Sequence, residues 1–522
     1  MKAKPKQTSS STRPSPTVLV GVILALAVLS LALLANSMTK PVSRDEQMYC
    51  TAGVLMAQGH TVYRDFSYPA QLPYHPLLLA TLYRTFSTEH YLLVGRLVSV
   101  VCEILILISI VGIYRSVLSP HRQMALLLGT AAGALYVFNP MVDYAAGYAW
   151  NHDVVVLCVV LSLWLLITTD FQGKRRHVRL ALMGALLTFA TCMRITTALV
   201  EVFFLVALCV AARGSLRNRV YAILPFSLAS LAVLVWPVSI AIRAGEAFRL
   251  NLIRIPALYG HWLQEIGIVH SKISLTLAAL SSPGYLALVA LAGYLVWLTA
   301  HRWKMLEPEM KAMSVTAGVL PLLFFVIAYI PPTMWRQYLA IPVPFLVIAL
   351  AYPFAALLRR SDTGKPARIA CLVTIVSLVI AVLANVGVLA RSIAVLVPEN
   401  WTPIVLHNVS TKIVSEMAEP KRVLTLGPLY ALEGGGGIYP ELASGAVVYR
   451  VADAMSAEER AMTHTVGLSG IRALTGQFPP DAVVLGVEPS YFSFLEDPLR
   501  GVTSPGWPRD LHESGLQIYR RP

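Results

Sequence analysis

The segment SRDEQMYCTAGVLMAQGHTVYRDFSYPAQLPYHP, residues 43–76, stands between the first two long apolar runs of the chain. It gathers acidic, aromatic, proline and histidine residues between stretches that are soluble in lipid. Asp45 and Glu46 are adjacent to each other a few residues beyond the end of the first run, and Asp65 follows. Polar groups gathered in this way at the mouth of a hydrophobic bundle make this loop the first place to look for chemistry.

The composition is that of a membrane protein. Of the 522 residues, 56% are hydrophobic and only 13% are charged, whereas soluble domains carry about 25% charged residues. The net charge of +14 does not indicate nucleic-acid binding. The basic residues lie in short loops between apolar runs, and they form no basic stripe on a soluble module.

The apolar runs predict a polytopic α-helical fold. A bilayer core of about 30 Å needs about 20 apolar residues per helix. By this criterion we expect eleven spans, at about residues 17–38, 92–113, 123–139, 153–169, 178–193, 196–212, 221–241, 276–299, 313–330, 338–357 and 369–390. Only Arg194 separates the fifth from the sixth, so one long helix with a buried charge is the alternative there. The first run is read as an uncleaved helix, because many spans follow it.

Basic residues predict the orientation in the membrane. Twenty Lys and Arg residues lie in the N-terminal tail, residues 1–16, and in alternate short loops. The loop at 139–152 has none, and the loop near Pro331 has only Arg336. Since basic residues stay on the cytoplasmic side, we expect a cytoplasmic N-terminus in a bacterial plasma (inner) membrane. The first loop (39–91), the loop at 243–272 and the chain after residue 390 then lie outside.

The last part of the chain, residues 391–522, predicts a small α/β domain outside the membrane. Short buried strands are expected at 423–427, 446–451, 482–486 and 516–520. A helix is expected at 456–464, because Ser456 is a good N-cap and acidic residues follow it. Residues 17–390 form the membrane domain in this reading. Four consecutive glycines at 434–437 lack the ending of a phosphate-binding loop and predict a flexible loop.

The sequence offers no local zinc motif. Neither a CxxC pair nor an HExxH motif occurs, which argues against a dedicated zinc site. Five of the six cysteines lie in apolar runs, and the sixth, Cys50, has no evident partner. The carboxylate pair Asp45–Glu46 can bind a divalent metal ion, but its spacing does not require one.

Two interpretations of Asp45–Glu46 follow from the residues alone. The pair can be a solvated acidic pair above a membrane helix. Alternatively, an amphipathic helix that runs on through Leu55 holds both carboxylates in its first turn, where the helix dipole favours negative charge. A carboxylate fixed at that point can act as a general base on an alcohol.

The layout resembles a known family. A basic tail and one span precede Asp45-Glu46, Tyr49, Ala52 and Gly59, and then Tyr63-Arg64-Asp65 and Tyr74-His75-Pro76. This order is similar to that of the C-type (GT-C) membrane glycosyltransferases, in the branch of the protein O-mannosyltransferases and the lipid A aminoarabinose transferases. The many spans, the acidic first outer loop and the outer C-terminal domain fit the same family.

The resemblance implies an enzyme and its partners. Such proteins move a sugar from a polyprenyl-phosphate carrier to an acceptor hydroxyl on the outer side of the membrane, with inversion. The chain would then be a hexosyl- or pentosyltransferase whose acceptor is an envelope glycan, lipid or protein. We expect the chain to contact membrane lipid and not to bind nucleic acid.

The resemblance also implies roles for carboxylates. Asp45 matches the catalytic aspartate of the first loop in the family, and Glu46 is its neighbour in the motif. Asp153, at the start of the fourth span, resembles a second carboxylate found at that place, and Asp143 in the same loop is its rival. An N-cap of a membrane helix is the other reading of Asp153.

A departing polyprenyl phosphate needs cations, and Arg side chains supply them well. Arg194 stands between two apolar runs, an expensive place unless it faces a partner. Anchoring to lipid headgroups is the alternative for every basic residue of the outer loops. The candidate donor and substrate contacts are Arg194, Arg254, Arg336, Tyr338, Tyr63, Asp65, His75 and Asp143. Within this set, Asp65 is expected to shape the loop rather than to react.

Two further points complete the expectations. Arg96 and Glu103 are about two turns apart in the second span, so we read them as a structural polar pair or a cavity wall. A transporter or flippase of a lipid-linked envelope precursor is the rival function. It would show internal repeats or broken helices in matching positions, and neither stands out in the sequence.

Overall fold

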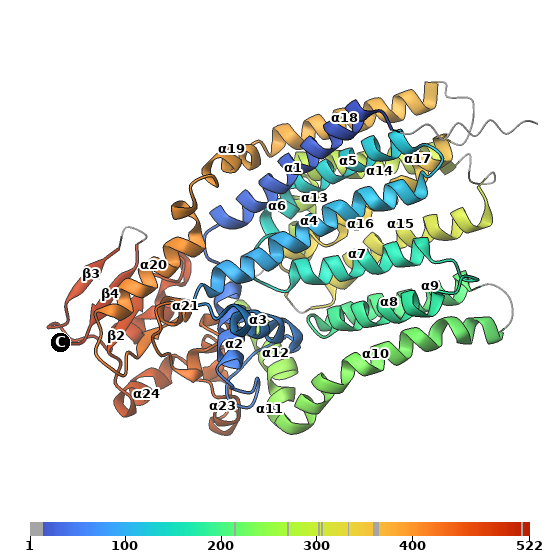
Figure 1. Ribbon diagram of the computed structural model, residues 1–522. Helices are drawn as coiled ribbons and strands as arrows, with labels where there is room; N and C mark the ends of the chain where they lie inside the picture. The colour runs from blue at the N-terminus through green and yellow to red at the C-terminus, as the bar shows by residue number, and fades with distance from the viewer. Residues whose placement is uncertain are drawn as a thin grey trace, which may run out of the picture.

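The computed structural model describes residues 14–212, 216–268, 271–300, 303, 306–331, 333–358, 365–512 and 515–522. Most of the predicted basic tail lies outside the described residues, as do several basic residues counted for the orientation: Arg213, Arg302, Lys304, Arg359 and Arg360. The described chain forms a bundle of long helices with a small α/β domain at one end (Figure 1).

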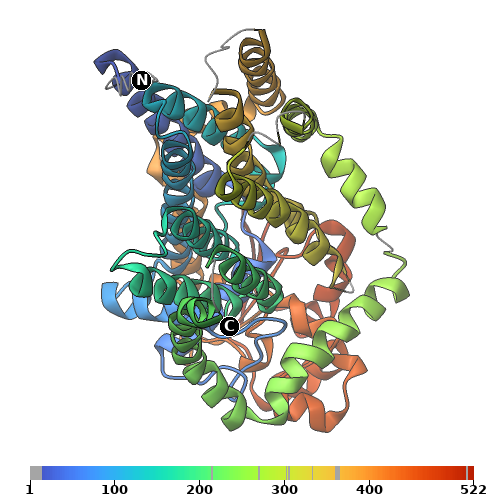
Figure 2. The ribbon, with the colours of Figure 1, turned by 90° about the vertical axis from the view of Figure 1, so that its right-hand side faces the viewer.

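The bundle is built from apolar helices. Seven helical segments among the described residues are long and apolar enough to cross a membrane: Pro16–Thr39 (α1), Tyr91–Val117 (α4), Leu216–Ala244 (α10), Pro283–Ala300 (α14), Pro308–Tyr329 (α15), Arg336–Leu358 and Pro366–Ala384. Two shorter apolar segments are His152–Thr168 (α7) and Ile195–Ala211. Figure 2 looks along this bundle from the end away from the C-terminal domain. The predicted polytopic helical class is confirmed, and the number of eleven spans stays a prediction.

Several predicted runs are interrupted helices. The fifth and sixth are two helices, α8 (Arg176–Thr191) and α9 (Ala198–Ala211), with a 3-10 turn between them at Ile195–Thr197. Arg194 has an extended backbone at this break. The eighth run is divided into α13 (Lys272–Leu280) and α14, because Pro283 has no N–H to continue the first helix.

Other runs are divided too. The segment Arg336–Leu358 consists of the 3-10 turn η4 (Arg336–Leu339), α16 (Pro342–Ala349) and α17 (Ala351–Leu358). The last predicted run becomes α18 (Lys365–Ala384) and α19 (Gly387–Ala394). The remaining bundle helices are α5 (Arg122–Val137) and the short α6 (Pro140–Ala145).

The first loop folds into two helices, α2 (Arg44–Ala57) and α3 (Tyr74–Phe86). Ser43 and Glu46 form a capping box at the start of α2: each side chain accepts a backbone N–H of the first turn. The predicted helix is therefore confirmed, but it is no surface helix, since all residues from Glu46 to Leu55 are buried. At Gly53 a Cβ would lie 2.8 Å from that of Leu79, so α3 packs directly on α2.

The loop after α10 is helical and is tied to the first loop. It consists of α11 (Glu246–Arg249), a π-helical turn (Leu250–Arg254) and α12 (Ile255–Glu265). The π turn carries the fully buried Asn251, whose Oδ1 accepts hydrogen bonds from Ser67 Oγ (2.6 Å) and Tyr68 N (2.9 Å). Two loops far apart in sequence thus form one polar layer at the α2 end of the bundle.

The C-terminal domain contains a four-stranded sheet in the order β1-β2-β4-β3. Its strands are β1 (Val423–Thr425), β2 (Ala482–Leu485), β3 (Arg509–Leu511) and β4 (Gln517–Arg520); β1 and β2 are parallel, and the other pairs are antiparallel. Its helices include α20 (Thr402–Ser415), α21 (Leu429–Leu432), α22 (Ala446–Tyr449), α23 (Ala457–Thr463), α24 (Ile471–Gln477) and α25 (Asp497–Arg500).

Two expectations for this domain need correction. The run at 446–451 is helix α22 and no strand, because its apolar residues pack around a helical turn instead of on a sheet face. The strand β3 was not expected, since its three residues are exposed at the sheet edge and two of them are charged. The expected helix at 456–464 is confirmed as α23, and Ser456 caps it in a second capping box.

The four glycines at 434–437 form no loose loop. The backbone N–H of Gly437 donates to Lys421 O (2.9 Å), and its carbonyl accepts from Val423 N (2.9 Å). A Cβ on Gly434 would clash with the carbonyl oxygen of Ser410 in α20. The glycines are there because the backbone passes close to its neighbours, so the flexible loop expected from the sequence is wrong.

The C-terminal domain rests on α2. The backbone N–H of Leu429 donates to Gln47 Oε1 (2.9 Å), and Ser444 Oγ donates to Ser67 O (2.6 Å). In Figure 1, α2 and α3 lie between the long helices and the C-terminal domain. Residues of α2 are therefore positioned to meet side chains from both parts of the molecule.

Candidate active site

Asp45, in the first turn of α2, has charged neighbours but no direct partner. Its carboxylate makes no hydrogen bond or ion pair with any residue in the part of the chain that the structure describes. Burial raises the pKa of Asp45, and the positive charges of Arg450, Arg44 and Arg194 oppose that rise. A carboxylate that is partly desolvated, unpaired and close to cations is typical of a functional site.

The residues around Asp45 come from every part of the fold. We call this group the Asp45 cluster: Asp45, Arg44, Tyr49, Arg194, Tyr259, Tyr338 and Arg450. Three of its members belong to α2, one to the α8–α9 break, one to α12, one to η4 and one to the C-terminal domain. The predicted site residues Asp45, Arg194 and Tyr338 are thus brought together.

Arg194 has unused hydrogen-bonding capacity. One guanidinium nitrogen, Nη2, donates to Asn151 Oδ1 (3.0 Å), and the group lies 5.9 Å from the centroid of the Tyr338 ring. The other, Nη1, is buried and has no hydrogen-bond partner in the described chain. A buried, unsatisfied guanidinium N–H is costly in the absence of a ligand, and an anionic group would satisfy it.

Arg450 enters the cluster from the C-terminal domain. It is only 4% exposed, and its Nη1 donates to the Tyr259 hydroxyl (2.9 Å). Its guanidinium also lies over the rings of Trp262 (5.4 Å) and Phe492 (5.8 Å). Aromatic faces hold this charge in place without neutralising it, and burial lowers the pKa of Arg450.

Arg44 links α2 to the C-terminal domain. Its Nη2 lies 2.9 Å from Glu488 Oε2, and its guanidinium is 4.6 Å from the centroid of the Phe492 ring. Burial raises the pKa of Glu488. Sequence reasoning missed Arg44, Arg450 and Glu488. The available signal was Arg450 itself, a single charge inside an apolar run, since a buried Arg is rare unless it has partners.

Glu46 lies beside Asp45 in sequence but is fully engaged. Its carboxylate forms two hydrogen bonds with Arg96 (2.8 and 2.9 Å), and it accepts backbone N–H groups from Ser43 (2.9 Å) and Ala149 (2.8 Å). Both side chains of the ion pair are fully buried. Arg96 further donates to the carbonyl oxygen of Ser37. Glu46 therefore positions α2 and leaves no oxygen free for a substrate.

Asp153, in the first turn of α7, holds a backbone segment. Its Oδ2 accepts the N–H of Gly147 (2.9 Å), and the N-cap of α7 is Asn151, so Asp153 is no N-cap. Nearby, Glu103 accepts the Tyr136 hydroxyl (2.6 Å). Asp153 and Glu46 thus fix the two ends of residues 147–149. Asn151 lies just after these residues and accepts a hydrogen bond from Arg194. Asp153 is therefore placed to position Asn151 and, through it, Arg194.

Arg96 and Glu103, the two charged residues of the second predicted span, do not pair with each other. Arg96 pairs with Glu46 and Glu103 with Tyr136. Both point into the bundle, as their spacing predicts.

Arg336 lies at the edge of the cluster. It precedes Tyr338 in η4, is exposed, and has its guanidinium 5.0 Å from the centroid of the Tyr144 ring. Both Asp45 and Arg336 are close enough to Tyr144 for their charges to affect the pKa of its hydroxyl. No ion pair of Arg336 exists among the described residues, so its charge is available.

Other predicted site residues are occupied elsewhere. Tyr63 is fully buried and donates to Gln71 O (2.5 Å). Asp143 forms an ion pair with Arg391, and Arg254 pairs with Glu459 (3.3 Å). The structure does not bring these three side chains to Asp45.

Asp65 and His75 also have contacts within the first loop. Asp65 pairs with Arg64 (2.7 Å), and this contact lowers the pKa of Asp65 to about 2. His75 is buried with its ring against Tyr49, and burial lowers the pKa of His75 to about 3, so the ring is neutral. Through Tyr49, His75 borders the Asp45 cluster without entering it.

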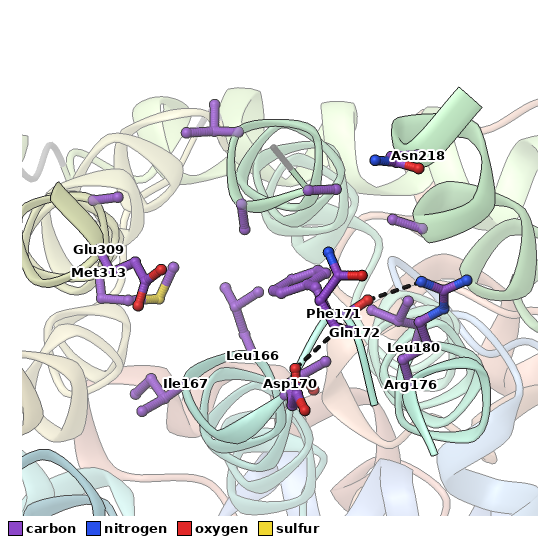
Figure 3. A pocket seen from close by; sticks show the side chains of 16 residues that line it. Leu166, Ile167, Asp170, Phe171, Gln172, Arg176, Leu180, Asn218, Glu309 and Met313 are labelled. Carbon is purple, nitrogen blue, oxygen red and sulfur yellow. Dashed lines mark hydrogen bonds between the residues drawn. The ribbon is translucent and has the colours of Figure 1, made fainter. Parts of the chain in front are cut away.

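A separate cavity of about 360 Å³ lies at the opposite end of the bundle (Figure 3). It is lined by the end of α7, the starts of α8, α10 and α15, and the end of α9. Two of its charged groups serve local structure: Asp170 accepts the N–H of Gln172 (2.9 Å), and Arg176 donates to Phe171 O (2.9 Å). The catalytic candidate is therefore the Asp45 cluster and not this cavity.

Comparisons with known proteins identify the fold. No protein-family model and no curated protein sequence matches this chain. The structure of ArnT from Cupriavidus metallidurans bound to undecaprenyl phosphate is similar over 96% of this chain and 97% of that chain, with a TM-score of 0.60 and 14% identity. The apo state of ArnT matches over 96% and 98%, with a TM-score of 0.61 and 13% identity.

A third structure extends the comparison. The oligosaccharyltransferase AglB from Archaeoglobus fulgidus, in complex with an inhibitory peptide and a dolichol-phosphate, matches over 97% of this chain and 74% of that chain, with a TM-score of 0.51 and 10% identity. ArnT, a lipid A aminoarabinose transferase, and AglB are both C-type glycosyltransferases. The chain thus has the fold of these multi-pass membrane proteins, and the predicted resemblance is confirmed at the level of the fold.

Proposed function

We propose that this chain is a membrane glycosyltransferase. It transfers a sugar from a polyprenyl-phosphate donor to an acceptor hydroxyl, with inversion, in the synthesis of a cell-envelope glycan, glycolipid or glycoprotein. The observation that carries the proposal is the Asp45 cluster. It offers one unpaired carboxylate together with guanidinium groups, on a fold shared with a protein that binds undecaprenyl phosphate.

The carboxylate has the properties of a general base. Asp45 accepts the proton of the acceptor hydroxyl as that oxygen attacks the anomeric carbon. Its raised pKa makes it a stronger base than an ordinary aspartate, and a proton acceptor works best when its pKa is nearer to the working pH. Because α2 is capped by Ser43 and fixed by the Glu46–Arg96 pair, the base is held in one place.

The guanidinium groups suit the leaving phosphate. As the bond from the sugar to the phosphate breaks, negative charge grows on the phosphate oxygen. Arg194 has a buried N–H without a partner, and Arg336 carries a charge without an ion-pair partner in the described chain. Donors aimed at developing charge stabilise the transition state most when they are fixed beforehand, and the aromatic contacts of Arg194 and Arg450 provide that rigidity.

The same proposal includes the orientation. The end of the bundle that carries α2, α3, α12 and the C-terminal domain faces the outside, and the end with the cavity of Figure 3 faces the cytoplasm. The basic loop residues Lys174, Arg175, Arg176 and Arg179, near that cavity, support this orientation. Lipid-linked sugars are the activated donors available on the outer face.

The test proceeds in two steps. Mass spectrometry of envelope glycans from cells with and without the protein identifies the sugar that depends on it. Purified wild-type protein and the Asp45→Asn variant are then supplied with the labelled polyprenyl-phosphate form of that sugar and with envelope acceptor. We expect covalent transfer by the wild type and none above background by the variant.

Two results would contradict the proposal. Equal transfer rates for the variant and the wild type would exclude Asp45 as the base. If the labelled lipid moved between leaflets of wild-type proteoliposomes with no covalent transfer, the protein would be a flippase and not a transferase.

A further inference from the structure

Three side chains with metal-binding atoms converge at the junction of the membrane bundle and the C-terminal domain. They are His90, which precedes α4, His407 of α20, and Glu433, which follows α21. One ligand atom from each lies within 4.8 Å of the other two. The three residues are not part of the Asp45 cluster, and the proposed reaction gives them no role.

The polar atoms of this group are buried without partners. His90 Nδ1, His407 Nδ1 and Glu433 Oε2 have no hydrogen-bond partner in the described chain. The other carboxylate oxygen, Glu433 Oε1, accepts the N–H of Leu92 at the start of α4 (2.6 Å). That bond fixes the carboxylate and turns Oε2 toward His407 Nδ1, at 3.4 Å.

Protons alone do not resolve this arrangement. The two imidazole rings are stacked with centroids 3.7 Å apart, where two imidazolium charges would repel each other. If both rings are neutral, the fully buried Glu433 carboxylate has no cation beside it, which is costly. If His407 alone is protonated, it pairs with Glu433, but the buried Nδ1 of His90 still has no partner in the described chain. A single metal cation bound between the rings and the carboxylate removes both costs.

We propose that His90, His407 and Glu433 bind a divalent transition metal ion of the zinc type. Imidazole nitrogen and carboxylate oxygen are ordinary ligands of Zn²⁺, which takes four ligands in tetrahedral geometry. Water can fill the fourth position. The hydrogen bond from Leu92 N orients the carboxylate as outer partners of metal ligands do.

Close backbone packing fixes the distance between the segment that carries Glu433 and helix α20, which carries His407. Gly434 follows Glu433 and packs against the carbonyl of Ser410, one turn along α20 from His407, so closely that a Cβ would not fit. This contact keeps the segment that carries Glu433 close to the turn of α20 that carries His407.

The bound ion would join the start of α4 to α20 and to the segment after α21. It would therefore tie the C-terminal domain to the membrane bundle on the α2–α3 side of the junction. This is a structural role, and it predicts a metal-dependent stability of the whole chain rather than a metal-dependent chemical step.

The experiment uses the full-length protein, purified in detergent through a tag without histidines. It is stripped with EDTA and titrated with Zn²⁺, and bound zinc is measured by mass spectrometry alongside thermal unfolding. We expect one Zn²⁺ per chain in the wild type and a rise in the melting temperature. For His407→Ala and Glu433→Gln we expect zinc affinity to fall more than about tenfold, because losing an outer partner alone costs about 10- to 100-fold.

The control is His60→Ala, which removes an exposed histidine of the loop between α2 and α3, and it should bind zinc like the wild type. Cobalt substitution of the wild type gives a second measurement that needs no variant, since Co²⁺ bound tetrahedrally absorbs visible light. Either of two results would overturn the proposal: stripped wild type that takes up no stoichiometric zinc, or equal zinc affinity in the wild type and His407→Ala. The three residues would then be a His–Glu contact only.

Discussion

Two sides of helix α2 carry the same chemical groups in opposite states of pairing. On the side toward α4, the carboxylate of Glu46 and the guanidinium of Arg96 form a fully buried pair in which every lone pair has a donor. On the side toward the C-terminal domain, Asp45 is surrounded by Arg44, Arg194 and Arg450 and is paired with none of them.

This difference separates a group that stabilises the fold from a group that can take part in a reaction. A satisfied buried pair holds a helix in place, and breaking it leaves a charge uncompensated. An unpaired carboxylate with nearby cations costs stability, and it is useful only when a substrate completes the arrangement. The presence or absence of partners therefore assigns Glu46 to the stability of α2 and Asp45 to the proposed reaction. Substitutions at the two positions test that assignment.

The largest expected effect is on catalysis at Asp45. Asp45→Asn should lower the transfer rate about 10²- to 10⁴-fold, the usual contribution of a general base. Because burial raises the pKa of Asp45 in the folded state, its ionised form opposes folding at neutral pH. The variant should thus unfold at the same or a higher temperature than the wild type. Transfer assays and thermal unfolding on one preparation measure both effects, and a destabilised but active variant would reverse the assignment.

The opposite pattern is expected at Glu46. Glu46→Gln leaves Arg96 without a charged partner in a fully buried site, so the free energy of unfolding should fall by about 3–5 kcal/mol. Denaturant unfolding in detergent measures this loss. The double variant Glu46→Gln/Arg96→Met removes both charges and should recover part of it. A Glu46→Gln protein as stable as the wild type would show that the pair does not hold α2.

A smaller effect is expected for the donor at Arg194. A hydrogen bond to a charged group contributes about 1.5–3 kcal/mol, so Arg194→Gln should weaken binding of the polyprenyl-phosphate donor about 10- to 100-fold. Binding of the fluorescently labelled carrier lipid to detergent-solubilised protein measures this change. The matched control is Arg254→Gln, whose guanidinium is half-exposed and paired with Glu459. Equal losses in both variants would point to general headgroup attraction.

The pH profile tests the surroundings of Asp45. The proposed reaction requires the ionised carboxylate, so the transfer rate should fall as the pH drops through the pKa of Asp45, which lies above that of an ordinary aspartate. Arg44 lowers that pKa. In Arg44→Gln the acid side of the profile should therefore move to higher pH. Transfer rates over a pH series compare the two proteins, and a shift to lower pH would contradict the assignment.

The smallest effect is expected at Asp65, a paired carboxylate of the same loop. Its partner Arg64 is largely exposed, and exposed pairs contribute less than about 1 kcal/mol. Asp65→Asn should change the unfolding free energy by less than that. Because Arg64 lowers the pKa of Asp65 to about 2, this stability is present above the ordinary aspartate pKa and is lost as the pH falls toward 2. Thermal unfolding between neutral and acidic pH checks the sign.

The sequence predicted the features that depend on local pattern. Apolar runs predict helices by themselves, and the spacing through Leu55 predicts a helix with Asp45 and Glu46 in its first turn, where α2 has them. Arg194 was identified as unusual because a charge between two apolar runs needs a partner, and the break between α8 and α9 lies at that residue.

Contacts between distant segments could not be predicted in this way. The partner of Glu46 is 50 residues away, and nothing in the spacing of Arg96 distinguishes Glu46 from Glu103. Arg450 lay in a run expected to be a strand, because short apolar runs do not distinguish a strand from a buried helical turn. The group of His90, His407 and Glu433 likewise has no linear motif, so the absence of CxxC and HExxH said nothing about it.

The Asp45 cluster takes its guanidinium groups from residues 44, 194 and 450, so it spans most of the chain. A ribosome makes Asp45 early and Arg450 near the end of synthesis. A nascent chain whose helices have already entered the bilayer therefore carries the proposed base while lacking part of the cationic surroundings. If the proposed function holds, a chain truncated after α19 should therefore insert into the membrane as an inactive product.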